Sequence, residues 1–242
     1  MRRNLLLSGG FGHDFAATSA EVAGILEQVG VVSEVVEDVE AGAAALAGEG
    51  RYDLLTVNAL RWRMLDERYA AARERLAFSP SPAARDAIRA FVAGGGGLLA
   101  LHSATICFDD WPEWGDILGA AWRWGRSSHP PVASAIVHVV TGSHPIVEGL
   151  SDFEIVDEIY GFLDVRPDVV ALLTSAHGGA QHPLVWARRY GAGRVVYDAL
   201  GHDTRSYAHP AQRAIVSRAA AWLLSEEAAS VGHEDHGRET GR

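Results

Sequence analysis

The chain of 242 residues contains no lysine, so all 21 of its basic residues are arginine. This absence excludes chemistry that depends on a lysine amine, such as Schiff-base formation or the lysine of a P-loop. The basic residues are outnumbered by 31 acidic ones, and the formal net charge is -10. Because nucleic-acid phosphates attract basic surfaces, this balance argues against DNA or RNA as the main partner.

Cysteine is nearly absent, and long apolar runs are missing. The single cysteine, Cys107, excludes an internal disulfide and any zinc finger built on several cysteines. No apolar stretch reaches the roughly 20 residues that a membrane-spanning helix needs. The first residues also lack the pattern of a secretion signal. We therefore expect a soluble, cytoplasmic protein that does not act at a membrane.

The first hundred residues alternate between strand-like and helix-like patterns. Buried strands are predicted at 4–7, 31–36, 52–57 and 98–101, with helices over 15–29, 41–47 and 83–93. This alternation is typical of a parallel sheet with helices on both faces. The third strand is expected to stop at Asn58. The arginine-rich segment 59–80 is interpreted as an insertion, and we favour a subunit contact or a solvated helix there over a substrate lid.

The second half of the chain predicts shorter strands with hairpin-like spacing. These strands are expected at 135–140, 153–160, 169–174, 184–188 and 194–199, with a turn at 190–193 and a helix over 210–224. Such spacing favours antiparallel additions to the sheet. We expect one domain over residues 1–224, followed by a disordered polar tail over 225–242.

Polar side chains follow several of the predicted strands. His13 comes after the first, Asn58 after the third, His102 and Ser103 after the fourth, and His202 and Asp203 after the last. Ligands of open parallel sheets bind beyond the carboxyl ends of the strands, so we expect three histidines to converge there. Histidine suits both proton transfer and metal binding, and the spacing does not decide between them. The histidines could also only cap helices or hydrogen-bond loops.

Two further groups of residues are candidates for binding a substrate. Trp111 and His129 belong to an aromatic-rich stretch, and aromatic faces are typical of sugar-binding sites, although tryptophans also serve as core. Asp157 and Glu158 should point to opposite faces of their strand. We assign Glu158 to the site as the carboxylate base. Tyr160 is kept among the substrate-binding candidates, although we place it on the other face from Glu158.

These landmarks together resemble the trehalose-utilisation (ThuA-like) family. The matching stretches are GGGGLLALHSAT at 94–105, WPEWGDILG at 111–119, SHPIVEGL at 143–150, DEIYGF at 157–162 and HPLVWARRYGAGRVVYDALGHD at 182–203. The resemblance covers residues 3–224. It implies a flavodoxin-like, class I glutamine amidotransferase-like fold: a three-layer α/β sandwich with a mostly parallel sheet and antiparallel additions in the second half.

The resemblance also shows where the chain departs from its fold relatives. They carry a nucleophilic cysteine on a strand-to-helix elbow, and a histidine and a glutamate after a later strand. Here His102 takes the elbow position, and His202 and Asp203 take the later one. Without a thiolate we expect no glutamine amidotransferase activity. A serine hydrolase that uses Ser103, with His202 as its base, remains open.

The family implies an enzyme of carbohydrate catabolism that acts on an oxidised (3-keto) sugar or disaccharide, beside a sugar dehydrogenase that supplies it. The expected chemistry is proton transfer leading to isomerisation or glycosidic cleavage, assisted by a divalent metal such as zinc. His102 and His202 would be proton-transfer groups or metal ligands, with His13 as a further candidate ligand. Asp203 would orient His202. The pocket would be lined by His13, Asn58, Ser103, Trp111, His129 and Tyr160. The rival hypothesis is a non-catalytic sugar-binding or regulatory module, and a homo-oligomer is left open.

Overall fold

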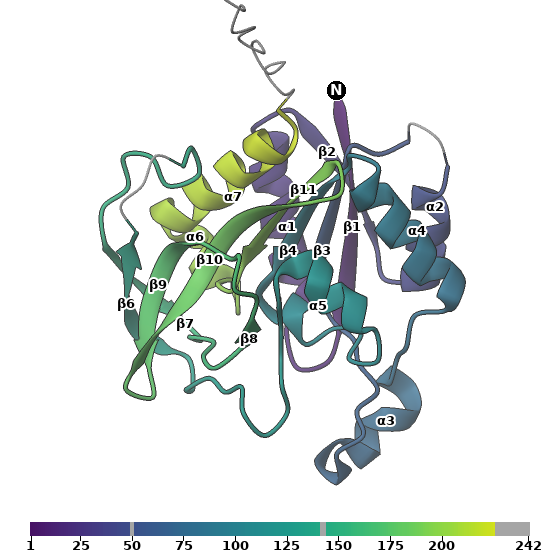
Figure 1. Cartoon of the computed structure of the whole chain (residues 1–242), viewed down its shortest axis with the longest axis horizontal. Coiled ribbons are helices and arrows are strands. Elements are labelled where there is room, and N and C mark those ends of the chain that lie inside the picture. The colour runs from purple at the N-terminus through teal and green to yellow at the C-terminus, as the bar shows by residue number, and fades with distance from the viewer. Residues whose placement is uncertain (49–50, 141–143, 226–242) are drawn as a thin grey trace, which may run out of the picture.

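A single nine-stranded sheet organises the computed structural model, which describes residues 1–48, 51–140 and 144–225 (Figure 1). The strand order is β2-β1-β3-β4-β11-β10-β9-β6-β7. The first five of these are parallel: β2 (Val31–Val36), β1 (Arg2–Gly10), β3 (Leu54–Leu60), β4 (Gly97–Leu101) and β11 (Gly193–Asp198). The other four are antiparallel: β10 (Ala180–Tyr190), β9 (Ala171–His177), β6 (Ala133–Val139) and β7 (Phe153–Asp157). The α/β fold with antiparallel additions is confirmed.

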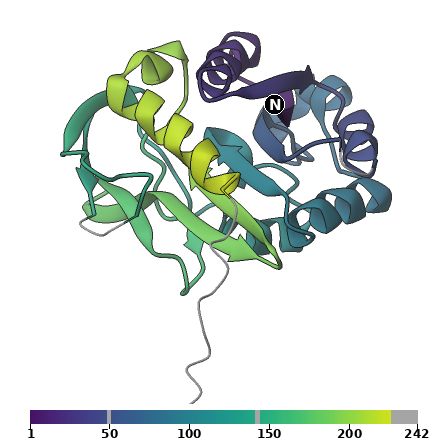
Figure 2. The same ribbon diagram turned by 90° about the horizontal axis from the view of Figure 1, so that it is seen from above.

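Helices cover both faces of the parallel half, as Figure 2 shows from above. One face packs against α1 (Phe15–Glu27) and α7 (Pro210–Leu223), and α6 (Thr204–Ala208) lies against both of these helices and β7. The other packs against α2 (Val39–Leu46), α4 (Pro82–Ala93) and α5 (Pro112–Leu118). This double cover explains why β4 is a continuous apolar run, since both of its faces are buried. Among the described helices, none is both long and apolar enough to cross a membrane.

Local sequence signals set the ends of these helices. Ser81 caps α4 by accepting a hydrogen bond from the Ala84 amide, and Pro82 occupies the first turn, where it costs no hydrogen bond. Ile88 and Val92 then face the core, and Gly94 ends the helix. The glycines that follow therefore form the short connection from α4 into β4.

Several strand limits differ from the prediction, and two of these differences affect the site. β3 continues through Asn58 to Leu60, because its last residues still pair with Gly9 and Gly10 of β1. β7 stops at Asp157, whose carboxylate accepts hydrogen bonds from a neighbouring loop, so that Glu158 lies beyond the strand. The insertion 59–80 supplies the end of β3, a 3-10 turn η1 (Glu67–Tyr69) and the short helix α3 (Ala70–Leu76).

The parallel strands end at nearly the same level, and this places the site. Leu101 at the end of β4 pairs with Asp198 at the end of β11, so the residues after these strands are neighbours. A 3-10 turn η2 (His102–Thr105) follows β4 directly, while a small second sheet pairs β5 (Ala120–Ala121) with β8 (Asp164–Val165). The predicted tail over 225–242 lies outside the described residues except for Ser225.

Candidate functional site

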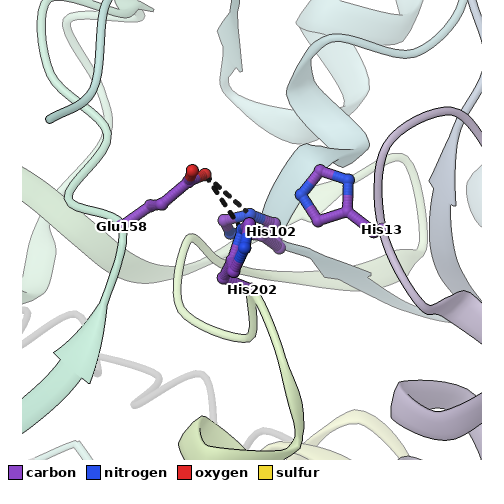
Figure 3. A group of neighbouring side chains, drawn as sticks. All are labelled: His13, His102, Glu158 and His202. Atoms are coloured by element: carbon purple, nitrogen blue, oxygen red, sulfur yellow. Dashed lines mark ion pairs between the residues drawn. The ribbon is translucent and has the colours of Figure 1, made fainter. Parts of the chain in front are cut away.

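Three histidines and one glutamate meet beyond the carboxyl ends of the parallel strands (Figure 3). His13 follows β1, His102 follows β4, His202 follows β11, and Glu158 follows β7 of the antiparallel half. One nitrogen or oxygen from each side chain lies within 4.8 Å of those from the other three. The three imidazole centroids are 4.7 to 5.5 Å apart. The structure therefore brings the histidines expected at three strand ends into one cluster.

His102 occupies a sharp elbow between β4 and η2. Its φ is 43°, a left-handed backbone conformation that costs energy for a residue with a Cβ and is enriched at functional sites. Its Nδ1 donates to the Ala199 carbonyl at 2.7 Å, which leaves Nε2 without a proton in the neutral ring. That Nε2 lies 3.4 Å from Glu158 Oε2 and 3.3 Å from the Tyr160 hydroxyl.

The ring of His13, like that of His102, is oriented by a hydrogen bond from Nδ1 to a backbone carbonyl. Its Nδ1 donates to the Phe11 carbonyl at 3.2 Å, and its buried Nε2 has no hydrogen-bond partner among the described residues. Burial, helped by the nearby His102, lowers the pKa of His13 to about 4. The imidazole is therefore neutral at pH 7, with an unshared electron pair on Nε2.

His202 is held by the loop between β11 and α6. Gly201 precedes it with a φ of +118°, and a Cβ there would lie 2.3 Å from the Tyr207 hydroxyl, so this turn requires glycine. His202 Nδ1 lies 3.2 Å from Glu158 Oε2, but the contact lacks the geometry of a hydrogen bond. The Glu158 carboxylate raises the pKa of His202.

Glu158 is 8% exposed and serves as the common partner of the imidazoles. Its Oε2 faces His102 and His202, and its Oε1 lies 3.2 Å from His129 Nδ1. Burial alone would raise the pKa of Glu158, but the contacts with these histidines together hold it far below its ordinary value. A carboxylate in this position is ionised at neutral pH. The Glu158 contact also raises the pKa of His129.

A cavity of about 740 Å³ opens above the cluster, within the usual size range of small-molecule sites. His13, His129, Glu158, Tyr160 and His202 form one side of it. Aromatic side chains make up much of the remaining wall, and they are Phe11, Trp62, Tyr69, Trp122 and Trp124. Tyr160 and Glu158 share this cavity, so placing Tyr160 on the other face was wrong. Residues two apart point the same way in an extended chain.

Three of the expected pocket residues lie elsewhere. Asn58 is 1% exposed and donates to the hydroxyls of Thr18 and Ser19, so it ties β3 to α1. Ser103 is fully buried and donates to the Ala59 carbonyl at 2.8 Å, which does not favour a serine nucleophile. Trp111 stacks on Trp114 beside a separate cavity of about 220 Å³. Strand-end position alone does not reveal the direction of a side chain, and this explains the errors at Asn58 and Ser103. Trp111 was proposed as an aromatic residue, but its ring packs in the core instead.

Asp203 and Cys107 also make their hydrogen bonds to neighbouring parts of the fold. Asp203 caps α6 through the Arg205 amide and pairs with the Arg205 guanidinium, so its hydrogen bonds do not orient the His202 ring. Cys107 is buried beside the separate cavity of about 220 Å³, and its thiol donates to the Ala59 carbonyl at 3.1 Å. Burial raises the pKa of the Cys107 thiol to about 12, so it is not a thiolate nucleophile at neutral pH.

The aromatic wall was the main feature that the sequence interpretation missed. Trp62 and Tyr69 come from the insertion 59–80, which was not expected to cover a substrate. Trp122 and Trp124 belong to the aromatic-rich stretch, but Trp111 was selected from it instead. The available signal was the position of Trp62 two residues beyond the end of β3, at the edge of the sheet where ligands bind.

The four-residue cluster fits a divalent metal ion by the chemistry of its donors. Three imidazoles and a carboxylate suit zinc and related transition metals. His13 Nε2 and His202 Nδ1 are buried nitrogens without a hydrogen-bond partner among the described residues, and an ion between them would satisfy both. The carbonyls behind His13 and His102 fix their rings in the way that second-shell partners fix metal-binding histidines.

Comparisons with known proteins agree with this architecture. A family model named ThuA, described as trehalose utilisation, matches residues 3–223. A ThuA-like protein from Parabacteroides merdae superposes with a TM-score of 0.76 at 19% identity, covering 99% of this chain and 95% of its own. A ThuA-like protein from Bacteroides uniformis gives a TM-score of 0.69 at 18% identity, covering 94% of this chain and 93% of its own.

A third solved structure, of a protein named as cytoplasmic from Salmonella typhimurium, gives a TM-score of 0.62 at 14% identity. It covers 92% of this chain and 99% of its own. No protein with a curated description matches the chain by sequence. At these identities the structural likenesses establish the fold alone.

Proposed function

The chain belongs to the ThuA family of trehalose utilisation, and from this premise we propose that it is an enzyme acting on an oxidised, 3-keto sugar. The family description places the chain in carbohydrate metabolism. The observation that carries the finer proposal is the cluster of His13, His102, Glu158 and His202, of which all but the buried His102 line an aromatic-walled cavity. Aromatic walls favour sugar rings, and the cluster suits chemistry at a carbonyl group.

The proposed reaction begins with the removal of a proton from the carbon next to the ketone. Negative charge then develops on the ketone oxygen, and the site must stabilise it. A divalent cation held by His13, His102, Glu158 and His202 would supply that stabilisation as a Lewis acid. Return of a proton to the other carbon of the enediolate gives isomerisation, whereas loss of a glycosidic oxygen from the next carbon gives cleavage.

Glu158, His13 and His102 have no free atom left to accept the substrate proton. Both Glu158 oxygens already face imidazoles, and the Nε2 atoms of His13 and His102 point into the cluster. His129 lies in the same cavity outside this set of four, with its side chain 36% exposed. We assign the proton transfer to His129, in place of Glu158, and the binding of a sugar hydroxyl to Tyr160.

The proposed substrate must be supplied by another enzyme. A ketone at this position of a sugar arises when a hydroxyl loses two hydrogen atoms, so a sugar dehydrogenase must act before this enzyme. We also propose that the reaction takes place in the cytoplasm, in keeping with the name of the Salmonella protein.

The test is NMR of a 3-keto-glucoside in deuterated water, with the protein stripped of metal by a chelator and then reloaded with zinc or manganese. We expect deuterium to appear next to the ketone with the loaded protein. His102→Ala should abolish the exchange, and His129→Ala should slow it roughly 100-fold or more. His138→Ala is the matched control, because His138 pairs with Asp152 outside the cavity.

Each other outcome has a defined meaning. Sugar binding without exchange under any loading would contradict the enzyme and support the non-catalytic sugar-binding module. Deuterium exchange by His129→Ala at the wild-type rate would show that another group transfers the proton. Deuterium exchange by the protein stripped of metal would show that the reaction does not require a cation.

A further inference from the structure

A serine and a histidine form a hydrogen-bonded pair beside the cavity of about 740 Å³. Ser128 lines this cavity, and its Oγ lies 2.9 Å from Nε2 of His177, the last residue of β9. Both residues are partly exposed, and neither belongs to the cluster that fits a metal ion. An imidazole in this position makes a serine nucleophilic, because it takes the hydroxyl proton as the oxygen attacks.

The fold holds both partners of this pair in place. The amide of Ser128 donates to the Gly161 carbonyl at 3.1 Å, and the Gly161 amide donates to the Ser128 carbonyl at 2.8 Å. A Cβ on Gly161 would lie 2.6 Å from Cδ2 of His177, so the imidazole packs directly against this glycine. Phe162 meets the same imidazole edge to face at 5.8 Å, with a φ of 57° that costs energy for a residue with a Cβ. The loop that pairs with Ser128 therefore also positions the His177 ring.

The surroundings of His177 favour the neutral imidazole that a general base needs. Burial, helped by the nearby His182 and His129, lowers the pKa of His177. His182 also ties the neighbouring segments together, because its Nδ1 accepts from the Phe162 amide at 3.2 Å and its Nε2 donates to the His177 carbonyl at 3.0 Å. In the neutral His177 ring we assign the proton to Nδ1, so that Nε2 accepts from the Ser128 hydroxyl.

The backbone beside Ser128 offers a donor for the negative charge that develops on an acyl oxygen during nucleophilic attack. The amide of His129 follows the serine directly, and it donates no hydrogen bond to any residue that the structure describes. The amide after the nucleophile is a recurring oxyanion-hole donor in serine hydrolases. Nucleophile, base and a free amide therefore occur together at this wall of the cavity.

A second cavity, of about 370 Å³, adjoins the pair and indicates the class of substrate. Phe162 and His182 line this cavity, and both rings contact His177. Tyr160 lines both cavities. The other lining residues are mostly apolar, and they are Arg126, Leu163, Val165, Ala180 and Pro183. Apolar walls suit the acyl chain of an ester, and the larger cavity has room for its alcohol part.

We propose that Ser128 and His177 form a catalytic dyad that hydrolyses carboxylic esters with a short acyl chain. Ser128 Oγ attacks the acyl carbon while its proton passes to His177 Nε2. The bond from the acyl carbon to the alcohol oxygen then breaks, and the alcohol leaves with that proton. Water attacks the acyl group on Ser128 and gives a proton to His177, which returns it to the serine oxygen as the acid departs. This activity needs no metal ion and is separate from the proposed function.

The experiment treats the full chain with a fluorophosphonate probe and, separately, with 4-nitrophenyl butyrate. We expect the probe to label Ser128, identified by mass spectrometry of the labelled peptide, and the ester to release nitrophenolate. Ser128→Ala should abolish both reactions. His177→Gln should slow both about 100-fold or more, because glutamine keeps a hydrogen-bond acceptor but cannot take the proton. Ser134→Ala is the matched control, since the Ser134 hydroxyl bonds to Glu154 outside both cavities.

Labelling of a serine other than Ser128 would overturn the dyad, as would unchanged rates in His177→Gln or the absence of both reactions in the wild-type protein. Because the labelled residue is identified in the wild-type protein, the test does not depend on the folding of a variant. A chelator should leave ester hydrolysis unchanged, and hydrolysis that is lost with the metal would also overturn the dyad. Hydrolysis without deuterium exchange keeps the dyad and rejects the keto-sugar enzyme, whereas exchange without labelling does the reverse.

Discussion

In each histidine of the cluster, the contact made by Nδ1 determines how the imidazole ring is oriented. His13 and His102 both donate Nδ1–H to a backbone carbonyl, which can only accept, so both direct Nε2 into the same space. Neutral imidazoles arranged in this way are typical metal ligands. His202 differs because its Nδ1 faces Glu158. The cluster thus combines two imidazoles whose Nε2 atoms are oriented by backbone carbonyls with a third imidazole whose Nδ1 faces Glu158.

A buried carboxyl outside the cluster gives a prediction about pH. Asp198 is 1% exposed at the end of β11, and burial raises its pKa from 3.8 to about 7. The folded state therefore binds the proton more tightly than the unfolded state. Stability associated with this proton is complete below pH 3.8 and is lost as the pH rises toward about 7. Within that window the free energy of unfolding falls by up to about 1.4 kcal/mol per pH unit.

Asp198→Asn should remove this pH dependence. The Gln212 amide donates to Asp198, and its own buried oxygen has no partner among the residues that the structure describes, so a rotated Gln212 can accept from the new Asn amide. Urea unfolding at pH 5, 6 and 8 should show the variant gaining stability relative to wild type as the pH rises. Asp152→Asn is the exposed control and should show no such gain. Parallel curves for Asp198→Asn and wild type would contradict the raised pKa.

At the residue scale, the sequence revealed the positions of polar groups better than their directions. The rule that ligands gather beyond strand ends correctly brought together His13, His102 and His202, because it depends only on the level at which parallel strands stop. It failed for Asn58 and Ser103, whose side chains turn into the core and bond to neighbouring elements. That choice depends on partners supplied by other segments, which the spacing of one segment does not contain.

At the scale of elements, Asp157 links the end of β7 to the loop that carries His202. Its carboxylate accepts hydrogen bonds from the amides of Gly201 at 2.8 Å and His202 at 3.2 Å. It also accepts from the Ser206 hydroxyl at 2.5 Å and the Glu158 amide at 2.8 Å. Since Glu158 is the next residue in the chain, the same contacts set the spacing between Glu158 and His202.

Asp157→Asn should therefore cost substantial stability. The amide of asparagine leaves one oxygen to accept four hydrogen bonds and places an NH₂ group among donors in a buried site. Hydrogen bonds to a charged acceptor contribute about 1.5–3 kcal/mol each, and we expect a loss of about 3 kcal/mol in the free energy of unfolding. Asp152→Asn, which is exposed and accepts from the Val139 amide, should lose less than about 1 kcal/mol. Equal losses for the two variants, measured by urea unfolding, would show that Asp157 does not tie the loop.

Apolar periodicity anticipated the regular elements but not the short ones. β4 is a continuous buried run, and α4 has a cap, a first-turn proline and apolar residues on one face, so both were predicted nearly at their observed limits. α5 and α6 were missed because helices of 7 and 5 residues are too short to show a repeat of 3.6. α6 depends on its Asp203 cap and on the Asp157 contact instead.

At the scale of the whole molecule, the candidate metal site joins the two halves of the sheet. His13, His102 and His202 follow parallel strands, whereas Glu158 follows an antiparallel strand at the far edge. Asp157 at the end of β7 already accepts hydrogen bonds from the loop that carries His202, so Glu158, the next residue, lies beside the histidines of the parallel half. An ion bound by all four side chains would connect the parallel and antiparallel halves of the sheet, so its binding requires both halves to be folded.

This geometry predicts that a bound ion stabilises the entire described fold as one unit. Zinc at 100 times its dissociation constant should add about 2.7 kcal/mol to the free energy of unfolding. For a chain of this size that corresponds to a rise of roughly 5–11 °C in the melting temperature. Scanning calorimetry of chelator-treated and zinc-loaded protein should show one transition that moves upward as a whole. His102→Ala should melt at the same temperature with and without zinc, while His138→Ala should respond like wild type, because His138 lies outside the cluster. A zinc-dependent shift that survives in His102→Ala would place the bound ion elsewhere. If zinc splits the transition, so that only part of the unfolding enthalpy shifts to higher temperature, the ligands do not join the two halves. The ion would then stabilise only the half that binds it.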